Sequence, residues 1–354
     1  MRYIVKSKRL FCLLLSVLIA ISTATSNSTT ASAAESTAAV YSLTFAGDIN
    51  LDESWSTTQT LDARGGRIEN CISADLLATM QTADVMCLNN EFTYSTRGKA
   101  MAGKAYTFRA NPARVSVLQT MGVDVAGLAN NHVYDYGADA LIDTLDTLDT
   151  AGIAHVGAGR SLTEAIKPCY VQLNGYTIAY VAASRAEKTK LTPQATDTQP
   201  GILRCYDTAL FCQAIAEARQ HADYVVALVH WGTEYSTKLE QVQRDTARLY
   251  INSGADAIIG AHSHCLQGLE YYAGKPIVYS LGNYWFNEKA LDTMLVTIDA
   301  GPGYTPTLRI TPALQANCTT MGLTDPSQQR AFYDRLEAIS VNVSIDDNGY
   351  VTAK

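Results

Sequence analysis

The sequence predicts an α/β protein with one large domain. From Tyr41 onward, short apolar runs typical of buried strands alternate with segments of helical periodicity, and such alternation is typical of layered α/β architectures. Apolar residues make up 47% of the 354 residues and charged residues only 17%, which is the composition of a chain with a sizeable core. Residues 41–354 show no internal repeat and no change of composition, so we expect a single domain there.

The first forty residues follow a different pattern, which predicts an export signal. Four positive charges precede or adjoin an apolar run from Leu10 to Ile21, and Ala31-Ser32-Ala33 follows as a small-residue cleavage site. We therefore expect a signal peptide over residues 1–33, a disordered linker over residues 34–40 and an extracytoplasmic protein, secreted or held at the cell surface. An uncleaved membrane anchor is the alternative, although the apolar run is shorter than the ~20 residues that span a bilayer.

Net charge and cysteine content exclude several classes of protein. Removal of the four positive charges of the leader changes the formal net charge from -7 to -11. We expect no nucleic-acid partner, because phosphate backbones are bound by basic surfaces. Of the eight cysteines, only Cys12 lies in the leader, and the others form no Cys-x-x-Cys motif. They predict neither a zinc knuckle nor a disulfide framework but small buried hydrophobes, with one or two disulfides left open.

The first half of the domain alternates strands and helices. Apolar runs predict strands at residues 41–48, 85–91 and 153–156 and within residues 123–132, with helices over residues 68–82, 112–121 and 138–150. The second helix follows Asn111-Pro112, where Asn suits the N-cap and Pro the first helical position. In the third, leucines share one face and aspartates lie mostly on the other, which indicates a solvated face and not a site.

The second half continues the pattern with two hairpins. Asn174-Gly175 between apolar runs predicts the first hairpin turn, and residues 273–275 predict the second. Helices are expected over residues 207–221 and 239–253, each followed by a strand that ends in histidine. Residues 186–204 have no period and contain two prolines, so we expect them to run over the surface. Residues 305–323 look strand-rich, and Asp325-Pro326 begins a last helix that ends near Ile339.

Polar side chains collect at the carboxyl ends of the predicted strands. They are Asp48, Glu91, Asn131, His132, His230, His262 and His264. In an open parallel sheet these ends lie on one side, where α/β proteins bind ligands. Two carboxylates, an amide and three or four imidazoles are suitable ligands for a pair of borderline divalent metal ions.

The two histidines of AIIGAHSH (257–264) are the densest part of this set. In an extended segment His262 and His264 share one face, so both imidazoles reach one metal ion. Each motif has a plainer explanation: His-x-His is common in turns, Gly-Asp often marks only a turn, and Asn-Asn-His would suit the cap of the helix that starts near Gly137. The ordered set on separate strand ends favours a metal site.

These motifs carry a family resemblance. They are GDIN (47–50), NNE (89–91), NNHVYDYG (130–137), HWGTEY (230–235), GAHSHCLQG (260–268) and SLGNYWF (280–286). From about Leu43 to Phe286 the chain resembles the CapA family of poly-gamma-glutamate capsule biosynthesis proteins, which is similar in turn to the calcineurin-like metallophosphoesterases. The resemblance implies a four-layer αββα sandwich of the metallophosphoesterase type, with residues 43–286 as its core and residues 287–354 adding C-terminal strands and a helix.

The resemblance also implies a role for each site residue. Two divalent ions, Mn, Zn or Fe, would be bound: the first by Asp48 and His264, the second by Asn131, His230 and His262. Glu91 would bridge them in place of the usual Asp, and His132 would act beside the bond to be cleaved. Asn50, a further candidate ligand of the first ion, stands where a metallophosphoesterase commonly has a ligating His, which implies a weak first site. Ser263 replaces the usual Pro between the two histidines.

Four further residues are candidates from their chemistry. Asp135 either orients His132 or caps a helix. Glu234 and Tyr235 are candidates for lining the cleft. Arg109, in FRANP, is the candidate for holding an anionic substrate, because its guanidinium grips a carboxylate or phosphate in bidentate fashion, although an exposed Arg is usually only solvated.

Two classes of function follow. The first is an extracytoplasmic metal-dependent hydrolase that acts on a phosphoester or related bond in surface-polymer metabolism. The second is a non-catalytic component that binds or exports an anionic polymer such as polyglutamate, with membrane-bound polymer-synthesis machinery as its partner. The ligand set favours the first, while the family name and the exchanges at Glu91 and Asn50 favour the second. Fold and family alone do not decide between them.

Overall fold

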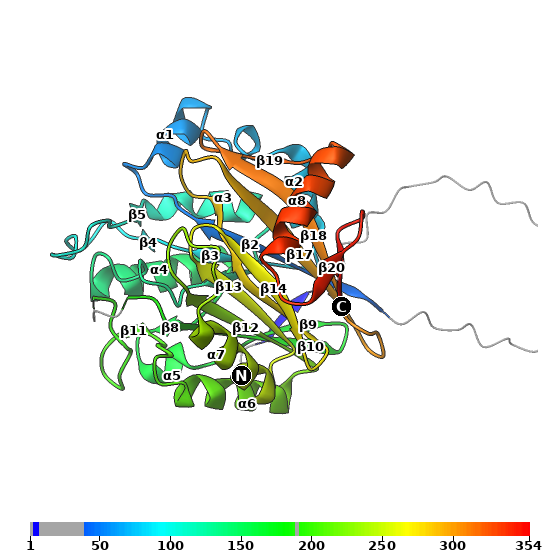
Figure 1. Ribbon diagram of the computed structural model, residues 1–354. Coiled ribbons are helices and arrows are strands. Elements are labelled where there is room, and N and C mark those ends of the chain that lie inside the picture. Colours follow the sequence, from blue (N-terminus) through cyan, green and yellow to red (C-terminus); the bar gives the residue numbers. More distant parts are fainter. Residues whose placement is uncertain (1–2, 7–38, 188–190) are drawn as a thin grey trace, which may run out of the picture.

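Two β-sheets packed face to face form the centre of the molecule (Figure 1). The computed structural model describes residues 3–6, 39–187 and 191–354. Within these residues the first sheet, here called the β12 sheet, has seven strands in the order β1 (Tyr3–Lys6), β9 (Cys169–Leu173), β10 (Tyr176–Ser184), β12 (Tyr224–Trp231), β13 (Ala257–His262), β15 (Lys275–Leu281) and β14 (Leu266–Tyr272).

The second sheet, here called the β2 sheet, has ten strands in the described residues. Eight follow the order β20 (Val343–Ile345), β21 (Tyr350–Ala353), β18 (Thr307–Ala316), β17 (Leu291–Ala300), β2 (Tyr41–Ile49), β3 (Val85–Asn90), β6 (Val125–Gly127) and β7 (Ala154–Val156), while β16 (Asn283–Trp285) pairs with β2 and β19 (Thr319–Gly322) with β18. Two small ladders pair β4 (Thr93–Tyr94) with β5 (Arg109–Ala110) and β8 (Ala158–Gly159) with β11 (Gly201–Ile202).

Helices cover the outer face of each sheet and complete four layers. In chain order the described helices are α1 (Ser56–Ala63), α2 (Ala74–Thr82), α3 (Val115–Thr120), α4 (Ala138–Ala151), α5 (Leu162–Ala165), α6 (Ala209–His221), α7 (Gln241–Asn252) and α8 (Pro326–Ala338), with 3-10 turns η1 (Ile68–Asn70) and η2 (Pro112–Arg114). Leucines of α2 and α4 pack on the β2 sheet, and Phe211 of α6 and Tyr250 of α7 pack on the β12 sheet. The αββα layering implied by the resemblance is therefore confirmed.

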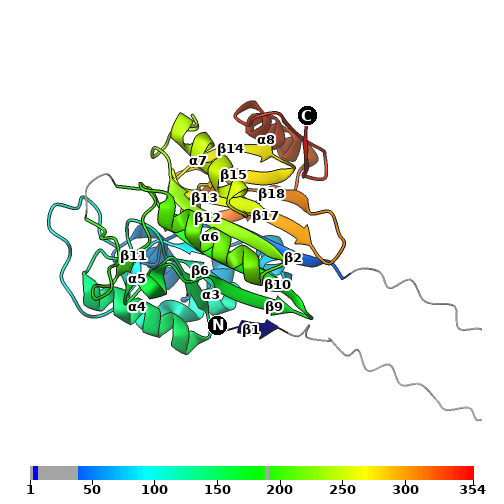
Figure 2. The same ribbon diagram turned by 90° about the horizontal axis from the view of Figure 1, so that it is seen from below.

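An extensive apolar core lies between the sheets. Phe45 and Cys87 of the β2 sheet meet Tyr180 and Ile259 of the β12 sheet there, all almost fully buried. Helix α8 closes one end of this core with Phe332 and lies across the molecule from α4 (Figures 1 and 2). Since both inner faces are apolar, the sheets remain packed together along their length, and polar side chains gather only where the strands end.

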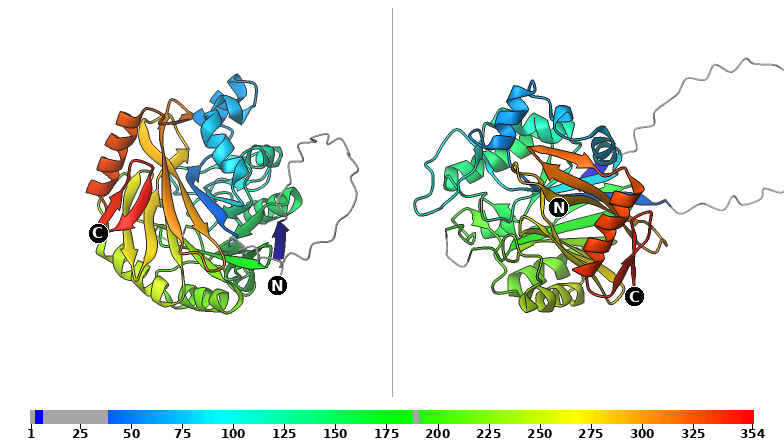
Figure 3. Two further views of the ribbon diagram at one scale, coloured as in Figure 1. Left: turned by 90° about the vertical axis from the view of Figure 1, so that its right-hand side faces the viewer. Right: turned by 45° about the horizontal axis from the view of Figure 1, so that its top comes forward.

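Most elements lie where the sequence predicts them, because their signals are local. Asn111 accepts a hydrogen bond from the backbone N–H of Ala113 at the start of η2, and Asp325 accepts from Ser327 and Gln328 at the start of α8. Asn174 and Gly175 both have positive φ in the hairpin between β9 and β10. Figure 3 shows this hairpin's sheet and α8 from two further sides.

The elements differ from the predictions in three places. The helix expected over residues 68–82 is broken into η1 and α2, because Ile72 forms a bridge with Thr320 and the backbone N–H of Ser73 donates to the Thr320 carbonyl. Helix α1 was not foreseen. Residues 186–204 do not simply run over the surface: β11 pairs with β8, and Thr192 and Ala195 are buried.

The N-terminal predictions fall mostly outside the described residues. Strand β1 lies parallel to β9 within the predicted signal peptide, whereas residues 7–38, which include the cleavage site and most of the linker, lie outside the described ranges. Among the described residues, no helix is both long and apolar enough to span a bilayer. The seven cysteines of these ranges are all free, and four of them are buried, as expected of small hydrophobes.

Candidate metal centre

The polar strand ends of both sheets meet at one place. Asp48 and Glu91 come from the ends of the parallel strands β2 and β3, and His230 and His262 from the ends of the parallel strands β12 and β13. The sequence argument used the rule for an open parallel sheet, whereas the ligands come from the two sheets of the sandwich that the resemblance implies. The cluster therefore receives donors from strand ends of both sheets, which the edge of a single sheet does not provide.

A close backbone approach places Asp48. The backbone N–H of Asp48 donates to the carbonyl of Gly282, 2.9 Å away, and a Cβ at Gly47 would lie 2.0 Å from that same oxygen. Only glycine at position 47 permits this contact. It joins the end of β2 to the turn before Asn283, which in turn holds His264: Oδ1 of Asn283 lies 2.8 Å from Nδ1 of His264.

The first group of candidate ligands contains Asp48, Glu91 and His264. One ligand atom from each lies within 4.8 Å of the others, and all three side chains are buried. Oδ2 of Asp48 is 3.3 Å from Nδ1 of His264. These are two carboxylates and one imidazole, the donor types that Mn²⁺, Zn²⁺ and Fe²⁺ accept.

The second group contains Glu91, His230 and His262, with the same separation of ligand atoms. Asn131 belongs beside it, because its Oδ1 is 2.7 Å from Nε2 of His230. Nε2 of His230 also lies 3.4 Å from Oε1 of Glu91. The structure thus divides the predicted ligands into two sets as the resemblance implies, with Glu91 in both.

Several buried polar atoms in this cluster make no hydrogen bond, and their chemistry shows whether a cation would fit there. Among the described residues, Oδ2 of Asp48, Oε1 of Glu91 and Nδ1 of His262 are buried and make no hydrogen bond, although the two carboxylate oxygens lie 3.3 and 3.4 Å from imidazole nitrogens of His264 and His230. Buried polar atoms are rarely left unsatisfied, because the loss of hydration is unfavourable. Three orphaned lone-pair donors within one cluster are what metal ions would satisfy, so the residues present fit such a group.

Electrostatics in the cluster follow from burial and from its own charges. Burial, then the negative charges of Asp48 and Glu234, raise the pKa of Glu91 well above its usual value. Burial lowers the pKa of His230 to about 3 and that of His262 well below its usual value. Both imidazoles are therefore neutral with a free lone pair, the form that a metal ligand needs. Burial opposes the shift, but the close contact with His264 and its charge lower the pKa of Asp48. The second close carboxylate, that of Glu91, favours a divalent ion at the same place.

The backbone around the two histidines differs from the prediction. The sequence suggested an extended His-x-His pair with both rings on one face. In the structure β13 ends at His262, and His262 and His264 have positive φ, +94° and +54°. Such conformations are strained for a non-glycine residue and concentrate at functional sites. The turn sends His262 to the second ligand group and His264 to the first.

His132 lies at the edge of the cluster and is held by Asp135. Nδ1 of His132 is 2.7 Å from Oδ2 of Asp135, and its ring packs 4.4 Å from the Phe108 ring. The N-cap of α4 is Gly137, with no side-chain cap, so Asp135 orients His132 and does not cap this helix. Burial lowers the pKa of His132, although Asp135 opposes the shift.

Comparison with known proteins places the chain in a family. A family model described as "Bacterial capsule synthesis protein PGA_cap" matches residues 42–288. The chain belongs to this family. The matched region contains every residue of both ligand groups, and the resemblance recognised from the motifs is confirmed.

Curated relatives are similar to this chain over part of their length. It is 37% identical over 227 residues to the PGA biosynthesis protein CapA of Bacillus subtilis (strain 168), covering 63% of this chain and 59% of that protein. It is 33% identical over 218 residues to the capsule biosynthesis protein CapA of Bacillus anthracis, covering 60% and 52%. The chain thus matches between half and three fifths of these relatives.

Among solved structures, the similarity is weaker. The NAD nucleotidase NadN of Haemophilus influenzae matches with a TM-score of 0.45 and 14% identity, covering 88% of this chain and 65% of that chain.

Two residues predicted for the PGA_cap site are engaged elsewhere. Oδ1 of Asn50 accepts a hydrogen bond from the backbone N–H of Asp52 at 2.8 Å, which leaves one lone pair of this oxygen for another partner. The Arg109 guanidinium lies 4.1 Å from the Tyr136 ring centroid and donates to the Arg97 carbonyl. Neither of these two contacts of the Arg109 side chain is with a residue of the ligand groups.

Glu234 and Tyr235, the candidates for lining the cleft, lie beside the first ligand group. Both are exposed, and the Tyr235 ring is 5.8 Å from the His264 ring. The Nζ of Lys289 stands 3.8 Å above the Tyr235 ring, and Glu234 is near enough to raise the pKa of Glu91. Both are therefore exposed side chains close to ligands of the first group.

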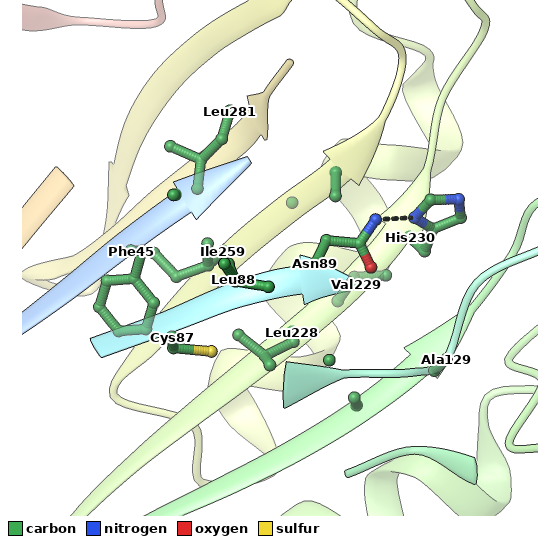
Figure 4. A pocket seen from close by; sticks show the side chains of 15 residues that line it. Phe45, Cys87, Leu88, Asn89, Ala129, Leu228, Val229, His230, Ile259 and Leu281 are labelled. Atoms are coloured by element: carbon green, nitrogen blue, oxygen red, sulfur yellow. Dashed lines mark hydrogen bonds between the residues drawn. The ribbon is translucent and has the colours of Figure 1, made fainter. Parts of the chain in front are cut away.

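Sequence reasoning missed the amides that hold the ligands. Nδ2 of Asn89 donates to Oδ1 of Asp48 at 2.8 Å and lies 3.3 Å from Nδ1 of His230. Figure 4 shows this last contact crossing from β3 to β12, above a narrow cavity of about 30 Å³ between the sheets. Asn89 and Asn283 stand in the motifs NNE and SLGN, so their motif positions were the signal that could have identified them.

Proposed function

We propose that this PGA_cap protein is a metal-dependent hydrolase that cleaves a phosphoester or related bond in the metabolism of an anionic cell-surface polymer. The observation that carries the proposal is the position of Glu91, whose carboxylate belongs to both ligand groups while its Oε1 makes no hydrogen bond in the described residues. A carboxylate shared by two sets of ligands is the arrangement of two-metal hydrolytic sites.

Each residue of the site has its own role in this proposal. Asp48, Glu91 and His264 would hold one divalent ion, and Glu91, Asn131, His230 and His262 the other. When bound, such ions would supply Lewis-acid polarisation of the bond and a water molecule of lowered pKa. His132 would donate a proton to the leaving oxygen, because its ring lies beside Asn131 and Asp135 fixes its orientation.

A second candidate is a non-catalytic component that binds or exports an anionic polymer. It is favoured by Asn50, which stands where a metallophosphoesterase commonly has a ligating His and whose oxygen already accepts a hydrogen bond from Asp52, so the first ion would be held more weakly. If the first metal site were weakly occupied, the protein would not catalyse hydrolysis and would act by binding the polymer. The names of the relatives, which refer to PGA and capsule biosynthesis, fit either candidate.

Location and partners complete the proposal. The basic and apolar leader supports export, so the domain would act outside the cytoplasm on a polymer or phosphoester. Membrane-bound polymer-synthesis machinery would be its protein partner, and the net negative charge makes nucleic acid an unsuitable one.

The test is metal binding followed by turnover on a phosphoester panel. Chelated protein should gain thermal stability when Mn²⁺ or Zn²⁺ is added, and His262→Ala should lose most of the gain. Wild type should then hydrolyse aryl and alkyl phosphoesters only in the presence of metal. Binding without turnover on any substrate would reject the hydrolase in favour of the polymer-binding candidate. An unchanged melting temperature in both proteins would reject the metal centre itself.

A further inference from the structure

A buried lysine links three loops beside the metal centre. Lys104 lies in the irregular segment between β4 and β5, and only 5% of its side chain is exposed. Its Nζ is 2.5 Å from Oδ1 of Asp135 and 3.2 Å from Oε1 of Glu187. It also donates to the backbone carbonyl of Asn131. These partners come from the loop after β6 and from the segment after β10.

The Lys104 contacts converge on the segment that carries Asn131 and His132. The Asp135 carboxylate is shared: Oδ1 faces Lys104, while Oδ2 accepts from the backbone N–H of Phe108 and lies 2.7 Å from Nδ1 of His132. The Asn131 carbonyl receives a second hydrogen bond, 2.8 Å long, from the Thr192 hydroxyl. Both the backbone of the amide ligand and the carboxylate that orients His132 are therefore fixed through one ammonium group.

This placement is unusual enough to require a reason. A lysine is rarely buried unless it is paired, because its charge loses hydration. Here the ammonium is matched by two carboxylates, Asp135 fully buried and Glu187 with 15% of its side chain exposed. If stability were the only outcome, an apolar residue packed in this place would serve as well or better. What an apolar side chain does not supply is three directed donors to fixed acceptors.

We propose that Lys104 is a positioning residue that sets the Asn131 and His132 segment in the geometry needed for metal binding and proton donation. The inference rests on the proposed metal centre. Outer contacts that orient metal ligands typically change metal affinity or activity by about 10- to 100-fold when they are removed. Lys104→Met keeps the length of the side chain and removes the donors, so it should weaken Mn²⁺ binding within that range.

A purely structural role has to be separated from positioning. Lys104→Met alone leaves Asp135 and Glu187 buried without a cation, so its loss of stability would not discriminate. The double variant Lys104→Met/Glu187→Gln removes one charge of each sign. If Lys104 only balances charge, the double variant should recover both stability and Mn²⁺ affinity. If it positions the segment, stability should recover while affinity stays low.

The experiment is a calorimetric Mn²⁺ titration of the full chain, combined with melting temperatures and phosphoester kinetics. Two matched controls are Glu187→Gln, which keeps Lys104 and its contacts to Asp135 and Asn131, and Lys167→Met, an exposed lysine. We expect both controls to bind Mn²⁺ like wild type, and the double variant to bind about 10- to 100-fold more weakly, with kcat falling more than KM rises.

The outcomes separate the two proposals. If wild type binds Mn²⁺ and the double variant binds it equally well, the role assigned to Lys104 is wrong and the metal centre stands. If Glu187→Gln weakens binding as much as the double variant does, the charge balance matters and the donors of Lys104 do not. If wild type does not bind Mn²⁺ at all, the metal centre fails and the inference fails with it.

Discussion

Replacement of Glu91 by Gln tests the shared carboxylate directly. Glu91 is fully buried, and burial together with the charges of Asp48 and Glu234 raises its pKa. Its carboxylate is therefore a source of repulsion in the metal-free protein. Gln has nearly the same shape without the charge, so the metal-free variant should be at least as stable as wild type. Its response to metal, in contrast, should nearly disappear.

The expected size follows from linkage between binding and folding. An ion that binds only the folded state stabilises it by about 2.7 kcal/mol when its concentration is a hundredfold above Kd. Two ions then contribute about 5.4 kcal/mol, roughly 8 °C in Tm for a domain of about 300 residues. If loss of the shared ligand weakens both sites a hundredfold, about 0.4 kcal/mol per ion remains, roughly 1 °C in total.

The assay is scanning calorimetry of chelated protein with increasing Mn²⁺. Glu217→Gln is the matched control, because Glu217 is an exposed carboxylate that pairs only with surface His221 among its described contacts. The control should keep the full rise in Tm. If Glu91→Gln also keeps the rise in Tm, then Glu91 is not a ligand of either ion. Its position in both ligand groups would then no longer support the proposed function.

Four further outcomes are expected. His132→Ala should keep the metal-dependent rise in Tm but lose about 10²- to 10⁴-fold in kcat on substrates with poor leaving groups and less on aryl phosphates; an equal loss on both would assign it positioning alone. N-terminal sequencing of exported protein should begin near Ala34, and an intact Met1 on cytosolic material would contradict the leader. Burial alone would raise the pKa of Glu270, but hydrogen bonds, that from Arg248 first, hold it below the usual 4.5. The stability that these hydrogen bonds supply is therefore present above pH 4.5 and is lost as the pH falls through the lowered pKa. Glu270→Gln should be less stable than wild type by about 1–3 kcal/mol in denaturant unfolding at pH 7, and this difference should shrink as the pH falls below 4.5; a constant difference would refute the pairing. Gly260→Ala should lower the free energy of unfolding by about 1–3 kcal/mol, because its Cβ would lie 1.9 Å from a carbonyl oxygen of the neighbouring strand. An unchanged free energy of unfolding would show that the strands move apart freely.

Local chemistry along the chain was enough to predict most elements and the ligand set. The leucine face of α4, the Asn174-Gly175 turn and the Asp325 cap depend on residues a few positions apart, so a short window contains the information. The ligand candidates were visible for the same reason: a polar residue directly after a buried strand is rare enough to be noticed. Glu91, His230 and His262 needed no knowledge of which strands are neighbours.

Only the tertiary structure decided how these residues combine. The assignment of strands to two sheets, the break between η1 and α2 at Thr320, and the approach of Gly47 to Gly282 depend on segments far apart in sequence, which no local pattern specifies. The separate destinations of His262 and His264 depend on positive φ values that packing imposes against intrinsic preference. Lys104 belongs to no motif, because its proposed role depends on three partners in distant loops. Its charge is buried beside these partners only once the chain has folded.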